Sequence, residues 1–569
     1  MYIFHLFRSF LPIHNPIGFG AGDFIELAIA LLLVWLALTW SGSRAAYARK
    51  FTEKTGWCML LLAILPVALR LLLLPHYPAP SPNVSDDFSY VLLADTLRHF
   101  RLANPPHPLP QFFETFFVLQ EPTYSSIYPL GQGIVLALGW TIFGHPWAGV
   151  LLPIGALCSL CYWMLRAWTT PGWALVGGLL AVFEFGPLNQ WMNSYWGGGV
   201  SAAAGCLVFG ALPRLRASGR RRDAALLGLG LGMQLLTRPY ESIFLGMSVV
   251  LFFLPELWRR EAIRKLVPPA LVSVLVVAPA IGLTLLQNKA VTGRWATLPY
   301  MLSRYQYGVP ATLTVQKNPI PHRQLTAQQQ LDYDVQSSVH AKDTDTLNRY
   351  LTRLASRARF YRFFFLPPLY LALLVFVATA REFRWVWVMI TLVLFALGTN
   401  FYPYFYSHYI AAITCLCVLA SVVGLEHLSR VSVRGTAVGC QAARLIVFLC
   451  AAHFVFWYGI HAFYDEDIVT AATRYETWDA INHGDPEGRL AIDGQLMKAP
   501  GKQLVFVRYW PQHLLHEWVN NAADIDGSRV VWARDLGPEE NEKLRGYYPD
   551  RTVWLLEPDA KPPRLTPYE

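Results

Sequence analysis

The sequence has little charge for its length. Only 15% of its 569 residues are charged, whereas 54% are hydrophobic and the mean hydropathy is +0.32. A water-soluble fold of this size has too little interior to hide such a composition. Apolar runs of bilayer length recur along the chain, so we predict a multi-pass membrane protein.

Several signatures of soluble enzymes and metal proteins are missing. The chain contains neither a G-x-S-x-G nucleophile motif nor a phosphate-cradling Gly-Lys-Ser/Thr loop. His99 and His107 have no i, i+4 histidine partner or nearby ligand cluster, so we predict surface histidines. These absences argue against serine hydrolases, P-loop enzymes and zinc enzymes.

Cysteine offers no framework either. Cys158 and Cys161 have redox or zinc spacing, but no second Cys or His pair accompanies them. The same side chains fit packing, because most cysteines here lie in apolar runs. We expect no disulfide framework.

The positive charge is arranged as in a membrane protein. The net charge of +9 could suggest a nucleic-acid partner, but the basic residues form short clusters between apolar runs. This pattern is typical of cytoplasmic loops. The strongest cluster comprises Arg214, Arg216, Arg220, Arg221 and Arg222. We place it inside and expect no nucleic acid.

The apolar runs predict about 12–13 transmembrane helices. The first, Phe24–Trp40, lacks the features of a signal peptide and is followed by a basic loop with Arg44 and Arg49. The second, Gly56–Leu74, then leads outward. Leu130–Phe143 is short, and we assign it as interfacial or re-entrant. The later runs are Trp147–Leu165, Trp173–Phe185, Gly198–Leu212, a run from Ala224, the run after Glu241, Leu266–Leu286, Phe363–Ala380, Trp385–Thr399, His408–Leu425 and Leu445–Phe463.

This topology places two long loops outside. The first long loop, residues 75–129, should contain surface helices over Asp87–Arg101 and Gln111–Leu119. The second long loop, residues 287–360, is polar and basic, and Thr346–Phe360 is compatible with a helix on lipid headgroups. An excess of cations there suits an anionic lipid substrate.

A carboxylate pair, Asp86-Asp87, opens the amphipathic part of the first long loop. Acids beside lipid are costly, so the pair should face water or a site. Alternatively, the pair caps a helix and suits its dipole. Arg70, near the outer end of its run, can snorkel.

Two other outer segments each allow two interpretations. The loop 189–196 carries Trp191 and Tyr195, which form an interfacial belt or stack on a sugar. Arg238 stands at an outer helix junction before Pro239, where an arginine snorkels or holds a phosphate by its planar fork.

The composition changes after residue 464. We divide the chain into a polytopic domain, 1–464, and a small soluble α/β domain, 465–569, on the outer face. Expected strands and helices in the second domain are Gln503–Arg508, Gln512–Asn520, Arg529–Trp532, Glu539–Tyr547 and Thr552–Leu556. It contains no clear pairing of nucleophile and base, so a structural cap or acceptor-binding module is expected.

With these features the chain resembles the polytopic GT-C glycosyltransferases, particularly the protein O-mannosyltransferases and lipid A aminoarabinose transferases. Asp86-Asp87 is similar to the family's Asp-Glu at the head of the first outer loop. Glu121-Pro122-Thr123 resembles its Lys/Arg-Pro-Pro return without the base, and Thr237-Arg238-Pro239 resembles its Thr-Lys-Gly-Pro junction. The similarity covers about residues 56–290 and extends to the final strands of an uncharacterised bacterial branch.

The resemblance implies a membrane all-α, GT-C-like bundle that moves a sugar from a polyprenyl-phosphate donor to an acceptor hydroxyl. Asp86 is the implied base, and Asp87 orients the acceptor or holds a divalent cation, the one cofactor considered. Arg238, Arg304 and Tyr128 are assigned to the donor phosphate. Acceptor or sugar contacts are assigned to Glu121, Tyr124, Trp191, Tyr195 and Tyr240.

The implied partners are the lipid-linked donor, membrane lipid, and a glycan, lipid or protein acceptor. The implied location is a bacterial inner membrane with the C-terminal domain on the periplasmic side. A lipid-linked glycan ligase or polymerase has similar long outer loops and remains an alternative. A polytopic transporter is another, although the chain shows no internal symmetry of the kind that transporters have.

Overall fold

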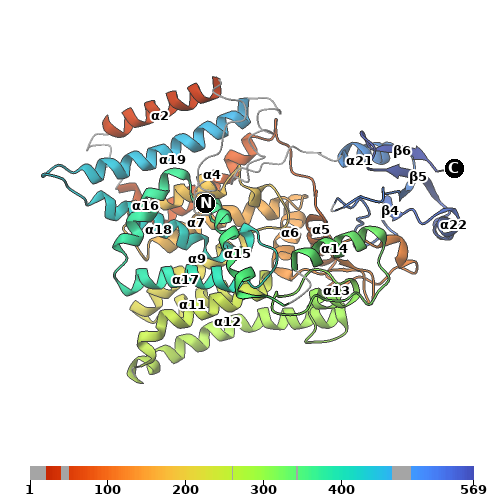
Figure 1. Cartoon of the computed structure of the whole chain (residues 1–569), viewed down its shortest axis with the longest axis horizontal. Coiled ribbons are helices and arrows are strands. Elements are labelled where there is room, and N and C mark those ends of the chain that lie inside the picture. Colours follow the sequence, from red (N-terminus) through yellow and green to blue (C-terminus); the bar gives the residue numbers. More distant parts are fainter. Residues whose placement is uncertain are drawn as a thin grey trace.

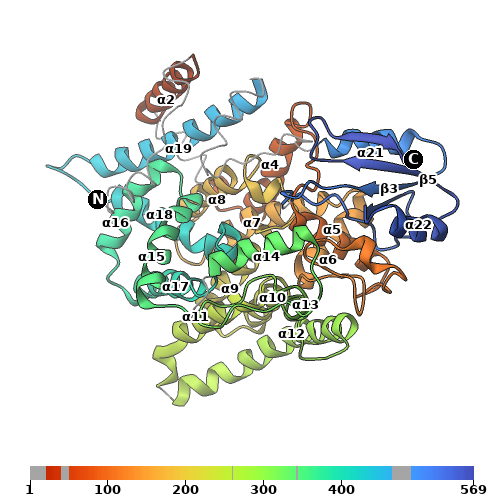
Figure 2. The ribbon, with the colours of Figure 1, turned by 45° about the vertical axis from the view of Figure 1, so that its right-hand side comes forward.

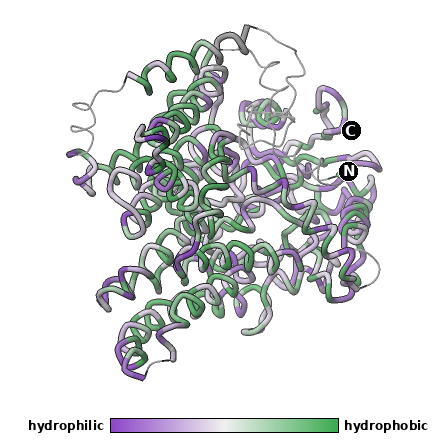
Figure 3. Tube along the Cα trace, turned by 60° about the vertical axis from the view of Figure 1, so that its left-hand side comes forward, coloured by the Kyte–Doolittle hydropathy of each residue, from purple (hydrophilic) through white to green (hydrophobic). Residues whose placement is uncertain are grey.

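The computed structural model describes residues 21–39, 50–258, 260–340, 344–463, 488–514 and 516–568. The predicted domain boundary at 464 and the basic residues Arg44 and Arg49 lie outside these ranges. The described chain is an α-helical bundle with a small sheet near the C-terminus, as predicted (Figure 1). Figure 3 shows apolar residues along the long helices and hydrophilic residues around the C-terminal part.

The bundle helices follow the predicted apolar runs closely. In chain order they are α2 (Ala21–Thr39), α4 (Thr55–Leu72), α6 (Leu130–Phe143), α7 (Ala148–Leu165), α8 (Pro171–Phe185), α9 (Gly199–Ser218), α10 (Arg221–Thr237), α11 (Pro239–Leu257), α12 (Arg260–Thr292), α16 (Tyr370–Thr379), α17 (Phe383–Thr399), α18 (Thr414–Ser429) and α19 (Val438–Phe463).

Within the described residues, six helices are long and apolar enough to cross a membrane, or up to seven if one bent pair is a single span. This confirms a multi-pass membrane protein, with fewer full-length spans than the sequence predicts. The difference arises because several predicted runs form shorter apolar helices. At 1.5 Å per residue, the 14 residues of α6 reach only about 21 Å, less than a bilayer core of about 30 Å.

The predicted span Phe363–Ala380 is broken in the structure. The 3-10 segments η3 (Ala358–Phe364) and η4 (Pro367–Leu369) precede α16, and the chain bends by 109° between Leu347–Phe364 and Pro367–Thr379. Proline disfavours helical backbone in the residue before it and removes an N–H donor. Leu366 is accordingly extended, with ψ of 139°. The second long loop therefore enters the bundle through a kink.

The long loops contain short elements. The first long loop has α5 (Ser85–Arg98), η1 (Pro110–Phe113) and the strand pair β1 (Val118–Leu119) and β2 (Ser125–Ser126). The second long loop has α13 (Pro299–Tyr307), α14 (Ala327–His340) and α15 (Leu347–Arg357). In Figure 2, α5, α13 and α14 lie on the side of the bundle nearer the C-terminal domain, whereas α15 lies farther from it, beside α17.

The C-terminal domain is built on a sheet with strand order β4-β3-β5-β6. Its elements are α21 (Arg489–Lys498), β3 (Lys502–Val507), β4 (Val530–Arg534), α22 (Pro538–Tyr547), β5 (Arg551–Glu557) and β6 (Arg564–Pro567). The first three strands of that order are parallel and β6 is antiparallel. The small α/β domain is thus present, with three strands close to the predicted ranges.

The first long loop forms part of the core of this domain. Strand β3 alternates, so Leu504 and Phe506 point to one face and Val505 and Val507 to the other. The first face packs against aromatic side chains of the first long loop, Phe112 and Phe113 among them, and the second packs with α21. The domain is therefore joined to the bundle by a shared hydrophobic core.

Two predicted helices are wrong. In Gln111–Leu119 the helical geometry ends after η1, because Glu114 is extended and Phe117 has a φ of +56°, and the chain then forms β1. In the described part of Gln512–Asn520 there is no helix. There the Tyr509 hydroxyl accepts the backbone N–H groups of Trp518 (2.7 Å) and Val519 (3.1 Å), which replaces helical hydrogen bonding.

Candidate active site at the N-terminus of α5

Helix α5 places the two predicted acids in its first turn. Its N-cap residue, Val84, makes no side-chain capping bond, so Asp86 and Asp87 supply the negative charge at this helix end. Their side chains have different surroundings. Asp87 is buried, with 3% of its surface exposed, whereas Asp86 is half-buried.

Asp87 is held by backbone N–H groups. Its Oδ1 accepts from Tyr195 N (2.7 Å) and its Oδ2 from Asn83 N (3.2 Å). Burial raises the pKa of Asp87 to about 7, although these two hydrogen bonds oppose the shift. Asp87 therefore ties the loop 189–196 to the start of α5, and this is a positioning role.

Arg70 also supports the loop 189–196. It is fully buried, which corrects the expectation that it snorkels to water. Its guanidinium donates to Asn193 Oδ1 (2.7 Å), Tyr77 O (2.9 Å) and Pro78 O (3.1 Å). The end of α4 is thereby fixed to the loop that holds Asp87.

Asp86 is the less buried of the two acids. Its Oδ1 accepts a hydrogen bond from the Tyr128 hydroxyl, and the Tyr128 ring stacks on Tyr90 at 4.2 Å. Burial raises the pKa of Asp86, while the Tyr128 hydrogen bond and the charge of Arg238 oppose the shift. A carboxylate with a raised pKa is a stronger base, which suits proton removal from a hydroxyl.

Arg238 supplies the nearby positive charge. It ends α10 and precedes α11, whose first position is taken by Pro239. Its guanidinium lies 4.6 Å from the centre of the Tyr409 ring and 4.0 Å from Glu241 Oε1, and 17% of the side chain is exposed. Within the described chain no hydrogen bond reaches this guanidinium. Such a group can bind an anion by its planar fork.

Tyrosines from distant segments surround these groups. The hydroxyls of Tyr300 and Tyr402 are 2.6 Å apart, and Tyr402 packs edge-on against Tyr409. The local charges of Asp86 and Arg238 both act on Tyr409. The site thus combines a carboxylate, a guanidinium and phenol side chains.

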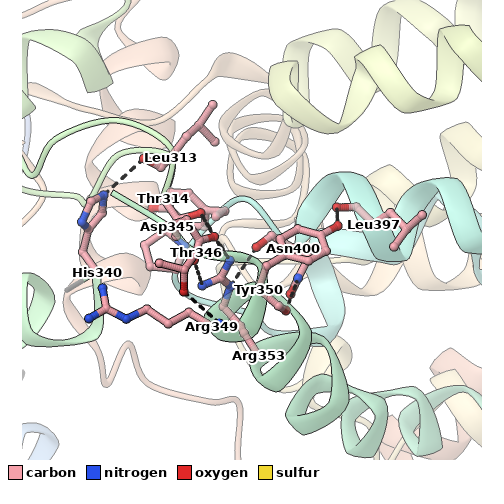
Figure 4. A network of polar contacts seen from close by, with 12 residues as sticks. Leu313, Thr314, His340, Asp345, Thr346, Arg349, Tyr350, Arg353, Leu397 and Asn400 are labelled. Atoms are coloured by element: carbon pink, nitrogen blue, oxygen red, sulfur yellow. Dashed lines mark hydrogen bonds and ion pairs between the residues drawn. The ribbon is translucent and has the colours of Figure 1, made fainter. Parts of the chain in front are cut away.

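A polar network fixes the turn that carries Tyr402 (Figure 4). From α15, the Tyr350 hydroxyl donates to Leu397 O (2.7 Å), and Arg353 Nε donates to Asn400 O (2.9 Å). Asp345 forms an ion pair with Arg353 and accepts from Thr314 at 2.8 Å. The second long loop is therefore anchored to the end of α17 beside the site.

Two predicted polar contacts serve mainly to hold the loops. Arg304 donates to Pro310 O (3.0 Å) and Ala311 O (2.8 Å), so two of its donors are occupied by its own loop. Glu121 forms an ion pair with Arg323 at 2.7 Å, which joins the two long loops. Neither side chain is brought to Asp86 by these contacts.

The aromatic residues predicted to contact the acceptor or a sugar have packing or hydrogen-bonding partners within the protein. Tyr124 bonds to Asn521 O at 3.0 Å in the C-terminal domain, and Tyr195 bonds to Pro80 O at 2.8 Å. Trp191 is 2% exposed and stacks on Phe185 at 5.5 Å. Tyr240 donates to Gly398 O at 2.8 Å, between α11 and α17. These four side chains pack or anchor helices and loops.

Glycine is required where Trp191 packs. Gly198 has a φ of +158°, and an added Cβ would lie 2.2 Å from the Trp191 ring. The Gly197-Gly198-Gly199 segment therefore allows close packing against Trp191.

The described residues contain no group of three or more His, Cys, Asp or Glu side chains that could hold a metal ion. Asp87, the predicted cation ligand, has a backbone N–H on each of its oxygens. Its surroundings fit a structural anchor better than a metal ligand.

Asp87→Ala should lower the apparent melting temperature of the purified protein. The change leaves two N–H groups without their acceptor, at a cost of about 1–3 kcal/mol for each that stays buried. Thermal unfolding in detergent measures the change in melting temperature. Asp334→Asn, at an exposed position, is the control. An unchanged melting temperature would contradict the anchoring role.

The same group predicts a pH dependence. The ordinary pKa of 3.8 applies to the unfolded chain and the value of about 7 to the folded protein, so folding favours the protonated form. The contribution of Asp87 to stability therefore falls between about pH 4 and 7 and is then constant. Asp87→Asn should remove this part of the pH dependence.

No protein-family model matches the sequence, and no curated protein matches it significantly. Among solved structures, ArnT from Cupriavidus metallidurans in the apo state is similar, with a TM-score of 0.49 and 12% identity over 89% of this chain and 93% of that chain. The same protein bound to undecaprenyl phosphate has a TM-score of 0.49 and 11% identity over 88% of this chain and 93% of that chain.

An Archaeoglobus fulgidus oligosaccharyltransferase tethered to an acceptor peptide has a TM-score of 0.46 and 10% identity over 88% of this chain and 69% of that chain. These proteins are members of the GT-C superfamily, which the sequence resembles.

Proposed function

We propose that this protein transfers a sugar from a polyprenyl-phosphate donor to an acceptor hydroxyl at the membrane surface. The supporting observation is the half-buried carboxylate of Asp86, which accepts the Tyr128 hydroxyl. It is accompanied by the Arg238 guanidinium, whose charge opposes the rise in the pKa of Asp86 and which has no hydrogen bonds to described residues. In this proposal the phosphate of the lipid-linked donor binds beside these two side chains.

Asp86 is the proposed general base. It removes the proton from the acceptor hydroxyl while the hydroxyl oxygen bonds to the anomeric carbon of the donor sugar. The bond from that carbon to the phosphate oxygen breaks in the same displacement, and the electron pair leaves with the polyprenyl phosphate. A phosphate leaving group needs little protonation, so a single carboxylate base suffices.

Arg238 is the proposed ligand of the donor phosphate. Its charge offsets the negative charge that develops on the leaving oxygen, and its fixed position between two helices limits reorganisation. Tyr128 has its hydroxyl on Asp86, so we assign it to orienting the base. This refines its predicted place at the phosphate.

The proposed reaction is a hexosyl or pentosyl transfer to a glycan, lipid or protein acceptor. The proposed location is a bacterial inner membrane with the C-terminal domain on the periplasmic side. The basic cluster from Arg214 to Arg222, at the far end of α9 from the loops, supports this orientation.

A turnover assay tests the proposal. The purified full chain in nanodiscs is given short-chain polyprenyl-phosphate mannose, glucose, galactose and arabinose with hexyl glucoside as acceptor. Release of polyprenyl phosphate together with a glycosylated acceptor is the expected result for at least one donor. Binding of these donors without turnover would contradict the proposal and favour a ligase, a polymerase or a transporter.

A further inference from the structure

Helix α5 lies between the bundle and the C-terminal domain, and its two faces carry different side chains. Asp86, Tyr90 and Leu93 follow one another at helical spacing on the first face. Tyr90 stacks on Tyr128, and Leu93 packs so closely on α6 that a Cβ added at Gly133 would lie 2.5 Å from its Cγ. This face contacts the bundle and carries the proposed base.

The opposite face of α5 contacts the C-terminal domain. Phe88, Leu92 and Asp95 form this face, again at spacings of four and three residues. Leu92 belongs to the hydrophobic cluster that includes strand β3, and Asp95 Oδ2 accepts from Ala523 N at 2.8 Å. Two residues turn a helix by about 200°, so Phe88 and Asp86 point to opposite sides.

Phe88 is contacted by a cation of the C-terminal domain. The guanidinium carbon of Arg489 lies 4.5 Å from the centre of the Phe88 ring. The same carbon is 4.9 Å from the ring of Trp532 and 5.4 Å from that of Trp518. Arg489 Nη1 also donates to Trp518 O at 2.9 Å. Only 12% of the Arg489 side chain is exposed, and such desolvation strengthens the attraction between a cation and an aromatic ring.

The position of Arg489 in its own helix is unfavourable for a positive charge. It is the first residue of α21, where the helix dipole favours anions and opposes cations. Asp493, one turn later, lies 3.9 Å from Arg489 Nε and offsets part of this cost. A residue that breaks a local rule of helix stability is expected where another role requires it. The contact with Phe88 supplies that role.

We infer that Arg489 is a positioning residue for the proposed base. By holding the Phe88 ring it fixes the first turn of α5, and the first turn sets the place of the Asp86 carboxylate. The inference rests on the proposed transfer reaction and adds a residue of the C-terminal domain to it. A general base must stay within hydrogen-bond reach of the proton that it removes, so a small rotation or shift of α5 slows the reaction.

Arg489→Met tests the inference, because it removes the charge and keeps most of the apolar stem. With the donor that turns over best, kcat should fall by roughly tenfold to a hundredfold, since a misplacement of about 1 Å can cost about 10²-fold. KM for the donor should be unchanged, because the donor phosphate is assigned to Arg238. Arg489→Lys keeps a cation at the ring and should restore most of the rate. The control is Arg508→Met, which removes a cation paired with Asp535 at 2.5 Å in the same domain and should leave kcat unchanged.

A double variant distinguishes positioning of the base from a general loss of structure. If Arg489 acts through Asp86, the protein that carries both Arg489→Met and Asp86→Asn should transfer sugar as slowly as Asp86→Asn alone, and no more slowly. Two losses that multiply would overturn the inference. An unchanged kcat in Arg489→Met would overturn it as well.

Hydrogen exchange separates this inference from the proposed reaction, because it needs no turnover. Backbone amides of α5 in the full chain in detergent should exchange faster in Arg489→Met and at the normal rate in Arg508→Met. Unchanged exchange in α5 would overturn the inference. Failure of turnover with every donor, together with faster exchange in α5 of Arg489→Met, would overturn the proposed reaction while supporting the hold of Arg489 on α5.

Discussion

Asp86→Asn should reduce sugar transfer by roughly 10²- to 10⁴-fold, the contribution typical of a general base. The amide keeps the size of the side chain and can still accept the Tyr128 hydroxyl, so folding and membrane insertion should be preserved. Initial rates with the best donor of the panel measure the effect. Melting temperature and elution volume verify that the variant is intact.

A pH profile identifies the base more specifically. Burial raises the pKa of Asp86 above its ordinary 3.8, and the base is active only when ionised. Activity of the unchanged protein should therefore rise with pH through that pKa and then level off, and the residual activity of Asp86→Asn should lack this rise. Asp334→Asn is the matched control. Transfer by Asp86→Asn within tenfold of the unchanged protein would exclude Asp86 as the base.

Arg238→Ala should weaken binding of polyprenyl phosphate by roughly 10- to 100-fold, because a charge-assisted hydrogen bond contributes about 1.5–3 kcal/mol. The rate constant of transfer should fall further, by roughly 10²- to 10³-fold, if the same group stabilises the leaving phosphate. Arg238→Lys keeps the charge without the planar fork, so its affinity for polyprenyl phosphate and its rate constant should lie between those of the unchanged protein and of Arg238→Ala.

The measurement compares undecaprenyl phosphate with undecaprenol. The unchanged protein should prefer the phosphate, and Arg238→Ala should bind both alike. Arg216→Ala is a suitable control, since Arg216 pairs with Glu256 at 2.5 Å at the other end of α9. A retained preference for the phosphate in Arg238→Ala would place the donor elsewhere.

Local sequence was sufficient to predict most of the helices and strands, and it singled out the acid pair at the start of α5. Apolar runs gave most bundle helices, alternation gave β3, β4 and β5, and an acid pair after an apolar run marked the start of α5. Each of these signals depends on residues within one helix or strand. The class of an α-helical membrane bundle with a small C-terminal α/β domain could therefore be predicted.

The different surroundings of Asp86 and Asp87 could not be predicted from the residues next to them in the sequence. Asp86 and Asp87 are adjacent in the sequence, yet their hydrogen-bond partners are distant: Tyr128 is 42 residues from Asp86, and Tyr195 is 108 residues from Asp87. Arg70 is equally ambiguous without Asn193, which lies 123 residues away. Aromatic residues in a loop also look alike whether they pack inward, as Trp191 does, or face a ligand.

The burial of a polar face of α14, formed by Gln328, Asp332 and Gln336, could not be predicted from local sequence either. Its spacing is visible in the sequence, but a polar stripe on a loop helix normally faces water. Only the packing of the second long loop against the C-terminal domain turns that stripe inside. The burial of Asp332 could therefore not be predicted.

The union of the first long loop with the C-terminal sheet has a consequence for biosynthesis. Asp95 Oδ2 accepts from Ala523 N at 2.8 Å, and these residues are 428 positions apart. At about 5–20 residues per second, a ribosome needs roughly 20–90 s to deliver the second partner after the first. The C-terminal sheet cannot cover Phe112 and Phe113 during that interval, so the face that carries α5 is completed only after nearly the whole chain has been translated.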